Sequence, residues 1–457
     1  MVLFFAIIIE EGEIMFDTIV ALATAPLISA IAVIRVSGSK ALEIVSKCFS
    51  KDLTSLTARN IVYGYVLDDD KKVDEVLLNV YPGNKSYTGE NLVEIQCHGS
   101  MIIVRQIIAL LIKHGARQAE RGEFTSRAFY NGKIDLVQAE SVNDMIHAQS
   151  EEAKDLALLS LEGKTSKKLT PIRTMIADLL SLIEVNIDYP EYEDIEQVTT
   201  KKVIEDVTKM QEIINELIKE GKQGKKIKDG IKVAIVGKPN VGKSSLLNAF
   251  IKEEKAIVTD IAGTTRDIVE GEIILHGIPL HLLDTAGIHE SDDKVEAIGI
   301  TKANEVLNEA DLVLLVIDSS KEEDSEDQEL RRKTASKKRI IVYNKKDLRS
   351  VERKTDGVYI SAKEEDIKEL EKRILEVLEI DQESYHRPSF SNERQLGLLN
   401  KAIIELEKAK EDALNGLTLD LIAVAIQEAY QSILEILGEA KGNDFSEEIF
   451  SRFCVGK

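Results

Sequence analysis

The stretch from Ile231 to Leu247 constrains this 457-residue chain more than any other. A short apolar run, Val233–Val236, predicts a buried strand, and Gly237–Ser244 after it fits the pattern GxxxxGK[ST] at every fixed position. In such a loop the backbone N–H groups point at phosphate oxygens, and the N-terminus of the following helix adds its dipole. We therefore predict a phosphate-binding loop in which Lys243 reaches the β- and γ-phosphates and Ser244 holds Mg²⁺.

Three later segments predict which nucleotide is bound. Asp284–Gly287 ends an apolar strand as Asp-Thr-Ala-Gly, which suits an acid near Mg²⁺ and a glycine amide that senses a γ-phosphate. In Asn344–Asp347 the carboxylate of Asp347 can accept hydrogen bonds from the ring N–H and the exocyclic amine of guanine, which adenine cannot supply. Ser361–Lys363 follows another short strand and is placed to close over the base. In this order, the segments predict a GTPase.

Charge and cysteine content limit the possible partners and compartments. The net charge of −21 means that contact with nucleic acid must come from a local basic patch or from a partner subunit. Three widely spaced cysteines, Cys48, Cys97 and Cys454, argue against a disulfide framework and predict a cytoplasmic protein. The apolar run Val2–Ile9 is too short to cross a bilayer, so it is predicted to be a strand or to precede the true initiator, Met15, and no membrane contact is expected.

The order of strand-like and helical text predicts a multidomain α/β fold. An N-terminal α+β domain is expected over residues 1–133, a helical domain over residues 134–228 and 380–457, and a P-loop GTPase domain of Ras-like α/β architecture, inserted in the helical domain, over residues 229–379. The basic run Lys222–Lys228 just before the GTPase strand is predicted to be a solvated linker.

Polar residues of the N-terminal region and the C-terminal cysteine have more than one interpretation. Arg35, Glu94, His98, Arg127 and Lys133 stand amid apolar strands or at helix starts, and composition alone favours caps and surface ion pairs. Cys454 lies three residues from the carboxyl end, where a thiol in a mobile tail is accessible and becomes nucleophilic if its pKa is lowered, although lone C-terminal cysteines are mostly inert.

Several segments together resemble the MnmE (TrmE) family of tRNA-modification GTPases. They are DTIVALAT, SYTGE-x₃-EI-x-CHG, GEFTSRAFYNGKIDL-x-QAE, the GTPase motifs and the terminal FCVGK, and they span Asp17 to Lys457. The resemblance implies a homodimer that acts with an MnmG (GidA)-like flavoprotein, which carries the FAD, in a heterotetramer or larger assembly. The expected product is a carboxymethylaminomethyl-type group on the wobble uridine of tRNA, made with formyl- or methylene-tetrahydrofolate and driven by GTP hydrolysis.

The resemblance also implies site residues. It places folate contacts at Arg35, Glu94, Lys133 and Lys457, and catalytic roles at Glu296 and Cys454. Mg²⁺ would be held by Ser244 and Thr265, and K⁺ by Asn240, Thr259, Ile261 and Thr264. The residues expected to contact GTP are Asn240, Val241, Gly242, Lys243, Ser244, Ser245, Thr259, Asp260, Ile261, Ala262, Gly263, Thr264, Thr265, Asp284, Thr285, Ala286, Gly287, Asn344, Lys345, Asp347, Ser361 and Ala362.

One residue supports the potassium site independently, and three segments depart from the family pattern. Ile288 follows Gly287 where Ras-like proteins place a water-orienting Gln, so another group must position the water. The family's ATPPG-x-GG reads ATAPLISA, ARPGEFT reads AERGEFT, and TNxRH reads SNERQ. A regulatory GTPase switch that binds ribosomal RNA or assembly factors is the alternative, and a stand-alone folate-dependent transferase is a third. FCVGK and the GEFT segment favour the modification enzyme, since a switch needs neither a terminal thiol nor a folate-type domain.

Overall fold

The computed structural model describes residues 8–10, 13–15, 17–189, 198–253, 269–283, 306–348, 355–380, 385–440, 446–451 and 453–456. Contacts divide the chain into two compact units, one formed by Met1–Asn143 with Leu434–Lys457 and the other by Asp144–Ile433. The limits of the units fall within helices α4 (Leu136–His147) and α14 (Leu419–Leu437). The C-terminal segment therefore belongs with the N-terminal unit, and the exact limits of the four predicted domain segments stay a prediction.

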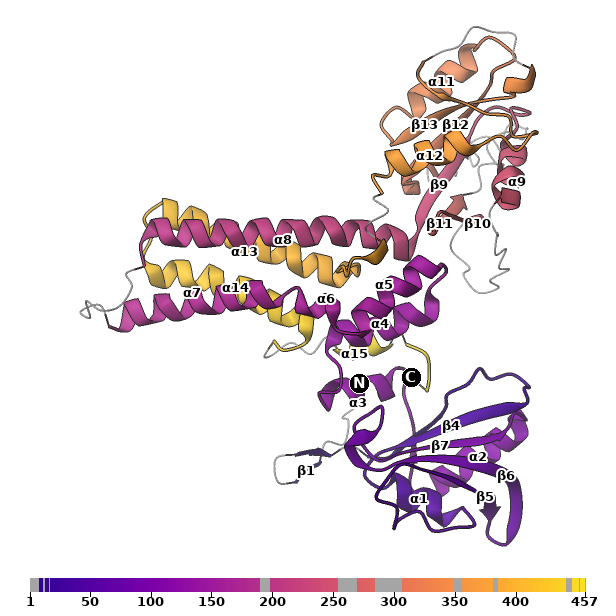
Figure 1. Ribbon diagram of the computed structural model, residues 1–457, viewed down its shortest axis with the longest axis vertical. Coiled ribbons are helices and arrows are strands. Elements are labelled where there is room, and N and C mark those ends of the chain that lie inside the picture. The colour runs from indigo at the N-terminus through magenta and orange to yellow at the C-terminus, as the bar shows by residue number, and fades with distance from the viewer. Residues whose placement is uncertain are drawn as a thin grey trace, which may run out of the picture. The chain divides into compact units, whose positions relative to one another are not determined.

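A six-stranded sheet is the centre of the first unit (Figure 1). Its strands, in spatial order, are β5 (Asn60–Asp68), β6 (Lys71–Tyr81), β7 (Leu92–His98), β4 (Ile31–Ser37), β3 (Ile19–Leu22) and β8 (Arg117–Gln118). All neighbours are antiparallel except β3 and β8, which are parallel. A separate antiparallel pair, β1 (Ile8–Glu10) and β2 (Glu13–Met15), precedes the sheet.

The two faces of this sheet differ in what covers them. Along β4, Ala32, Ile34 and Val36 are buried against α1 (Ala41–Lys47) and α2 (Met101–Lys113), in the alternation that a half-buried strand requires. On the opposite face, Phe124 of α3 (Glu123–Tyr130) joins a smaller core with β3 and β7. The rest of that face mixes polar and apolar side chains: the exposed apolar ones include Ile31, Ile61, Tyr63 and Leu77, and Glu75 and His98 are exposed among them.

The C-terminal segment packs against α3. Phe450 of α15 (Ser446–Ser451) is 3% exposed, and its ring centroid lies 6.2 Å from that of Phe129. Gly122, at φ +68°, precedes α3 at a point where an added Cβ would lie 2.4 Å from the carbonyl oxygen of Phe450. Only glycine accepts both the left-handed backbone and this close approach.

Helices form the first and the last parts of the second unit. They are α5 (Glu151–Leu161), α6 (Lys164–Lys167), α7 (Thr170–Asp188), α8 (Thr200–Asp229) and, after the second sheet, α13 (Glu393–Leu414) and α14. α8 runs antiparallel to α13, because Gln211 bonds to Glu407 while Lys225 pairs with Glu393 (Figure 1).

The predicted linker at Lys222–Lys228 is wrong, because these residues form the last turns of α8. Lys225 pairs with Glu393, Lys226 donates to the carbonyl oxygen of Leu378, and Lys228 pairs with Asp144. The lysines are therefore part of a packed helix end and not of a solvated connection.

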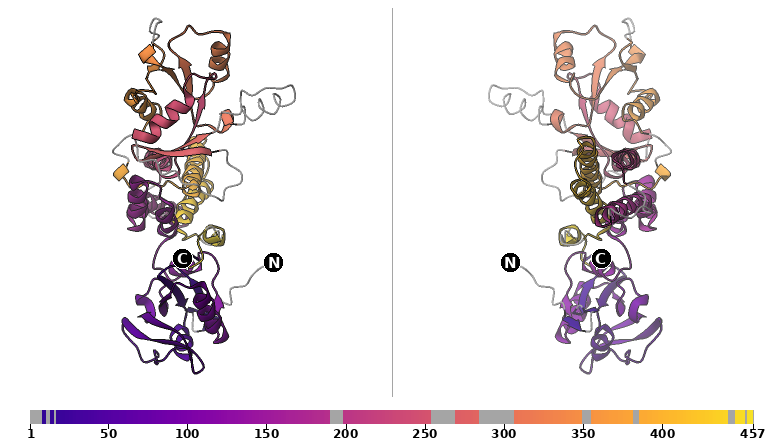
Figure 2. Two further views of the ribbon diagram at one scale, coloured as in Figure 1. Left: turned by 90° about the vertical axis from the view of Figure 1, so that its right-hand side faces the viewer. Right: turned by 90° about the vertical axis from the view of Figure 1, so that its left-hand side faces the viewer.

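The chain between α8 and α13 forms a mostly parallel sheet with helices on both faces (Figures 1 and 2). Its strands, in spatial order, are β10 (Val269–Leu275), β11 (Ile278–Leu283), β9 (Ile231–Val236), β12 (Leu312–Asp318), β13 (Arg339–Asn344) and β14 (Val358–Tyr359). The described helices of this region are α9 (Lys243–Glu253), α11 (Ser325–Lys333) and α12 (Lys368–Val377). Apolar clusters fill both faces, as parallel sheets require. The predicted fold class, an α+β domain with a helical domain that receives a P-loop domain, is confirmed.

Within the described residues, no helix combines the length and apolarity needed to cross a membrane.

Candidate functional site

The loop between β9 and α9 has the tight geometry that its glycines predict. An added Cβ on Gly237 would lie 2.4 Å from the carbonyl oxygen of Val316, and Gly242 has φ +98°. Asn240 also has a positive φ, of 63°, so the chain turns sharply before α9 begins at Lys243. Ser244 and Ser245 are exposed in the first turn of α9. The loop therefore presents backbone and hydroxyl groups at a helix N-terminus, where anions are favoured.

The side chain of Lys243 lies across this loop. Its Nζ donates to the carbonyl oxygens of Gly237, at 2.6 Å, and Lys238, at 3.0 Å. Burial lowers the pKa of Lys243. Phosphate oxygens entering the loop would offer this ammonium stronger, charged acceptors than two carbonyls.

Lys238 anchors the loop to a neighbouring helix, which the sequence analysis did not predict. Its Nζ lies 2.6 Å from Asp324 and 2.7 Å from Asp327, the two residues that form the capping box of α11. Burial opposes the charge of Lys238, but the two carboxylates outweigh it and raise its pKa, while the hydrogen bond from Lys238 lowers the pKa of Asp324 to about 2. The spacing Asp-x-x-Asp signals the helix start, but its partner is visible only in three dimensions.

Asn344 and Lys345 join the phosphate loop to the predicted base-binding segments. The Asn344 amide donates to the carbonyl oxygen of Val241, at 2.9 Å, and accepts from the N–H of Ala362, at 3.0 Å. Lys345 Nζ bonds at 2.7 Å both to the carbonyl oxygen of Asn240 and to Asp318, at the end of β12. After Lys238, Asp318 is the second residue of this site whose contact was not predicted from the sequence.

Ser361 is bonded to the residue that is predicted to read the base. Its side chain is buried, and its hydroxyl donates to the carboxylate of Asp347 at 2.8 Å. Asp347 itself is exposed. Ser361 and Ala362 therefore hold Asp347 and Asn344 in place, and closure of this segment over the base stays a prediction.

The structure brings the described residues of the predicted nucleotide site together at the carboxyl ends of β9, β12 and β13, where ligands of open α/β sheets bind. The remaining predicted residues lie outside the described part of the chain. They are Thr259, Asp260, Ile261, Ala262, Gly263, Thr264, Thr265, Asp284, Thr285, Ala286, Gly287, Glu296 and Lys457.

A second group of polar residues gathers in the first unit. Arg35 and Glu94 are directly opposite each other on β4 and β7 and form an ion pair of 2.9 Å. The guanidinium of Arg35 lies 5.6 Å from the ring centroid of Tyr87, and it donates to the carbonyl oxygen of Gly456 at 3.2 Å. The C-terminal segment thus meets the predicted folate residues, although 421 positions separate Arg35 from Gly456.

Lys133 and Cys454 lie on the borders of this group. Lys133 donates to the carbonyl oxygen of Asn84, at the start of the loop that carries Tyr87. The thiol-bearing residue Cys454 is exposed, and its carbonyl oxygen accepts from the N–H of Gly122 at 3.3 Å. The C-terminal segment is thereby held at two backbone carbonyls, that of Cys454 and that of Gly456.

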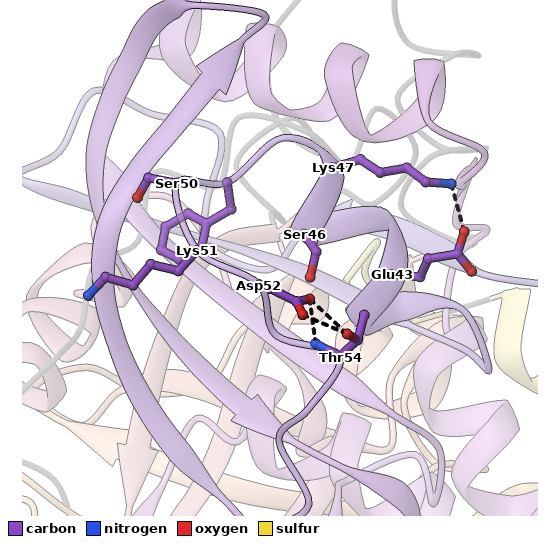
Figure 3. A pocket seen from close by; sticks show the side chains of 8 residues that line it. Glu43, Ser46, Lys47, Ser50, Lys51, Asp52 and Thr54 are labelled. Atoms are coloured by element: carbon purple, nitrogen blue, oxygen red, sulfur yellow. Dashed lines mark hydrogen bonds and ion pairs between the residues drawn. The ribbon is translucent and has the colours of Figure 1, made fainter.

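A shallow hollow elsewhere on the first unit does not belong to either group. It lies at the end of α1, where Figure 3 shows Lys47 bonded to Glu43 and Asp52 bonded to Thr54. Its polar side chains largely satisfy one another, and none of them is a predicted site residue. It therefore adds nothing to the sites described above.

Sequence comparison covers both units. The family described as "GTP-binding protein TrmE N-terminus" matches residues 18–133, and the one described as "MnmE helical domain" matches residues 136–454. The chain belongs to the MnmE family of tRNA modification GTPases. The tRNA modification GTPase MnmE of Lactococcus lactis subsp. lactis is 42% identical over 449 residues, which cover 97% of this chain and 99% of the relative. That of Bacillus mycoides is 42% identical over 456 residues, which cover 97% and 100%.

Solved structures give a weaker likeness. Era of Aquifex aeolicus, crystallised with GDP and aluminium fluoride, is 28% identical and matches 38% of this chain and 66% of that chain, with a TM-score of 0.26. A score this low supports no structural argument.

Proposed function

We propose that this protein is the GTP-hydrolysing component of an enzyme that modifies the wobble uridine of tRNA. The observation that carries the proposal is the junction made by Asn344, which ties the phosphate loop at Val241 to the base-binding segment at Ala362. A glycine-rich turn with no nucleotide to bind would not require hydrogen bonds that join these two segments. Family membership supports the tRNA substrate.

The nucleotide site would use its own residues in separate roles. Lys243 would turn from its two carbonyl acceptors to the β- and γ-phosphates, and Asp347, oriented by Ser361, would accept from guanine. The exposed hydroxyl of Ser244 at the start of α9 is a hard oxygen donor of the kind Mg²⁺ prefers, and Thr265 would be its second protein ligand. Mg²⁺ when bound would neutralise charge on the phosphates.

K⁺ is proposed as the second cation of the site. Asn240 is exposed in the loop, and its side-chain amide offers the hard oxygen that K⁺ accepts. The carbonyls of Thr259 and Ile261 and the hydroxyl of Thr264 would complete the ligands. Bound K⁺ would supply fixed positive charge where an arginine finger acts in other GTPases. Because Ile288 stands where Ras-like proteins have Gln, Glu296 would orient the attacking water.

A one-carbon tetrahydrofolate is proposed at the Arg35 group. Arg35 and Lys133 supply cationic donors for the glutamyl tail, with Lys457 as a third, and Glu94 supplies an acceptor for the pterin ring. Cys454, held beside this group by its backbone, would act in the modification step.

A homodimer, a flavoprotein partner and a cytoplasmic location complete the proposal. The exposed apolar side chains of the first sheet, among them Tyr63 and Leu77, are suited to burial against a second copy. The FAD would be carried by an MnmG-like partner, in a heterotetramer or larger assembly, and not by this chain.

The direct test is modification of the wobble uridine of tRNA by the purified chain with its flavoprotein partner and GTP. Lys243→Ala and Asp347→Asn should each abolish both GTP turnover and modification. Modified tRNA from either variant at the wild-type rate would refute the proposed coupling of hydrolysis to modification. GTP turnover that is unchanged in both variants would refute the assigned nucleotide site.

A further inference from the structure

The hairpin β10–β11 lies between the helices of the second unit and the nucleotide site. β11 pairs in parallel with β9, and β9 leads directly into the phosphate loop. In the sequence, β11 also leads directly into Asp284. The strand is thus connected to two of the motifs that would bind GTP, while β10 is the edge of the sheet.

The turn of the hairpin contacts helical residues at two points. The hydroxyl of Tyr385, in the connection between α12 and α13, donates to the carbonyl oxygen of His276 at 2.9 Å. An added Cβ on Gly277, which has φ +85°, would lie 2.2 Å from the carboxyl carbon of Glu152 on α5. The turn is therefore in close contact with α5 and with the start of the returning helices.

His281 joins the middle of the hairpin to the end of α8. Its Nε2 lies 3.0 Å from the carbonyl oxygen of Asp229, the last residue of α8, and its Nδ1 lies 3.1 Å from Glu272 on β10. Both partners are acceptors, so both contacts are hydrogen bonds at once only when both ring nitrogens carry a proton. An added Cβ on Gly230, at φ +74°, would lie 2.5 Å from Nε2, so glycine is required for this approach.

Glu272 extends the chain of contacts to the segment before α5. Its second carboxylate oxygen accepts from the amide of Gln149 at 3.0 Å. Apolar packing runs alongside, because Leu156 of α5, Ile227 of α8 and Tyr385 belong to the same buried cluster as the side chains of β9 and β11. A displacement of the hairpin cannot leave these neighbours unchanged, since packed interiors transmit strain.

We propose that the hairpin β10–β11 couples the nucleotide site to helices α5 and α8, with Glu272 and His281 as its positioning residues. The inference rests on the proposed GTP binding at the phosphate loop. Nucleotide bound there would favour one position of β9 and β11, and the bonds of Gln149, Tyr385 and Asp229 would carry that preference to the helices. A coupling of this kind is reciprocal, so the helices would also bias nucleotide affinity.

The test is amide hydrogen exchange of the full-length protein, read by mass spectrometry with and without a non-hydrolysable GTP analogue. In the wild type, the analogue should change exchange in α5 and in the last turns of α8 as well as around the phosphate loop. The double variant Gln149→Ala/Tyr385→Phe removes two side-chain bonds to the hairpin and leaves the hairpin itself intact. Its nucleotide-dependent difference in α5 and α8 should fall by about fivefold for each bond removed.

Gln223→Ala is the matched control, because Gln223 on α8 bonds to the carbonyl oxygen of Glu379 and not to the hairpin. It should keep the wild-type response. Tyr385→Phe alone loses one hydroxyl and no packing volume, so it tests the coupling even if the double variant is unstable. An unchanged response in the variants, or no response of α5 and α8 in the wild type, would overturn the inference. Failure of the analogue to bind at all, measured by titration calorimetry, would overturn the proposed function as well.

Discussion

At the scale of single residues, Asn344 contacts two segments that are far apart in the sequence. It is 2% exposed, and its amide is bonded on one side to Val241 and on the other to Ala362. Without this side chain, the carbonyl oxygen of Val241 and the N–H of Ala362 would each lose a hydrogen-bond partner. An unpaired buried polar group costs about 1–3 kcal/mol, which exceeds the net value of most hydrogen bonds.

Asn344→Ala should therefore weaken GTP and GDP binding by about tenfold to a hundredfold, with part of the loss seen as lower stability. Equilibrium titration with a fluorescent GDP measures the affinity. Glu329→Gln is the control, since Glu329 lies on α11 in an exposed pair with Lys333. Wild-type affinity in Asn344→Ala would contradict the role given to the junction.

Residues of the site that are adjacent in sequence could be predicted, and those that meet across the fold could not. The phosphate loop follows from eight consecutive residues, because its backbone geometry is set by Gly237 and Gly242. The pair of Lys238 with Asp324 and the bond of Arg35 to Gly456 join distant segments, so no local spacing signals them. Ser361 was expected near the base because it follows a short strand after the earlier motifs, but its bond to Asp347 could not be predicted, since the two residues meet only in the fold.

At the scale of elements, a buried charge network fixes α3 to the strands beside the C-terminal segment. Arg127 is 1% exposed and pairs with Glu123 at 2.8 Å, with Asp17 at 2.9 Å and with Glu90 at 3.3 Å. Arg117 adds pairs of 2.7 Å to both Asp17 and Glu123. The network holds α3 in place. Gly122, the residue just before α3, donates its N–H to the carbonyl oxygen of Cys454 in the C-terminal segment.

This network predicts acid sensitivity with a defined sign. Burial opposes ionisation of Asp17 and Glu123, but the hydrogen bonds and charges of the arginines outweigh it and lower both pKa values below 3.8 and 4.5. Their stabilisation is present above these ordinary values and is lost as the pH falls through the lowered ones. Burial raises the pKa of Glu90. The stability that Glu90 contributes is therefore present at low pH and is lost as the pH rises.

The thermal midpoint should therefore fall steeply below about pH 4.5, and Glu123→Gln should flatten this slope. Glu90→Gln is the contrasting variant: it removes a contribution of the opposite sign, so it should not flatten the slope. Melting curves followed by circular dichroism at several pH values measure both. An identical slope in Glu123→Gln and the wild type would contradict the assignment of acid sensitivity to this carboxylate.

Helix α8 shows why one prediction at this scale was wrong. The sequence KQGKKIK suggested a solvated linker because it is a short basic run. In the fold, Gly221 and Gly224 lie against Phe390 and Ser389, where an added Cβ would come within 2.5 Å and 2.2 Å of their atoms. These glycines serve close packing, which composition does not distinguish from flexibility.

At the scale of the whole molecule, the terminal cysteine and the nucleotide site belong to different units. Cys454→Ser should therefore leave GTP hydrolysis at the wild-type rate and abolish modification of the wobble uridine. Hydrolysis is measured by phosphate release, and modification by mass spectrometry of digested tRNA. Fully modified tRNA from the variant would show that the thiol is dispensable, and slowed hydrolysis would contradict the separation of the two roles.

In the proposed function, a K⁺ bound at Asn240 supplies the catalytic charge of the GTPase. The most direct measurement is GTP hydrolysis by the purified full-length protein in matched KCl and NaCl buffers, with the oligomeric state followed as GDP and aluminium fluoride are added. Turnover should be faster in KCl, the dimer should close only with K⁺, and Asn240→Ala should lose the K⁺ effect. Turnover and oligomeric state that are the same in both salts would contradict the proposed K⁺ site.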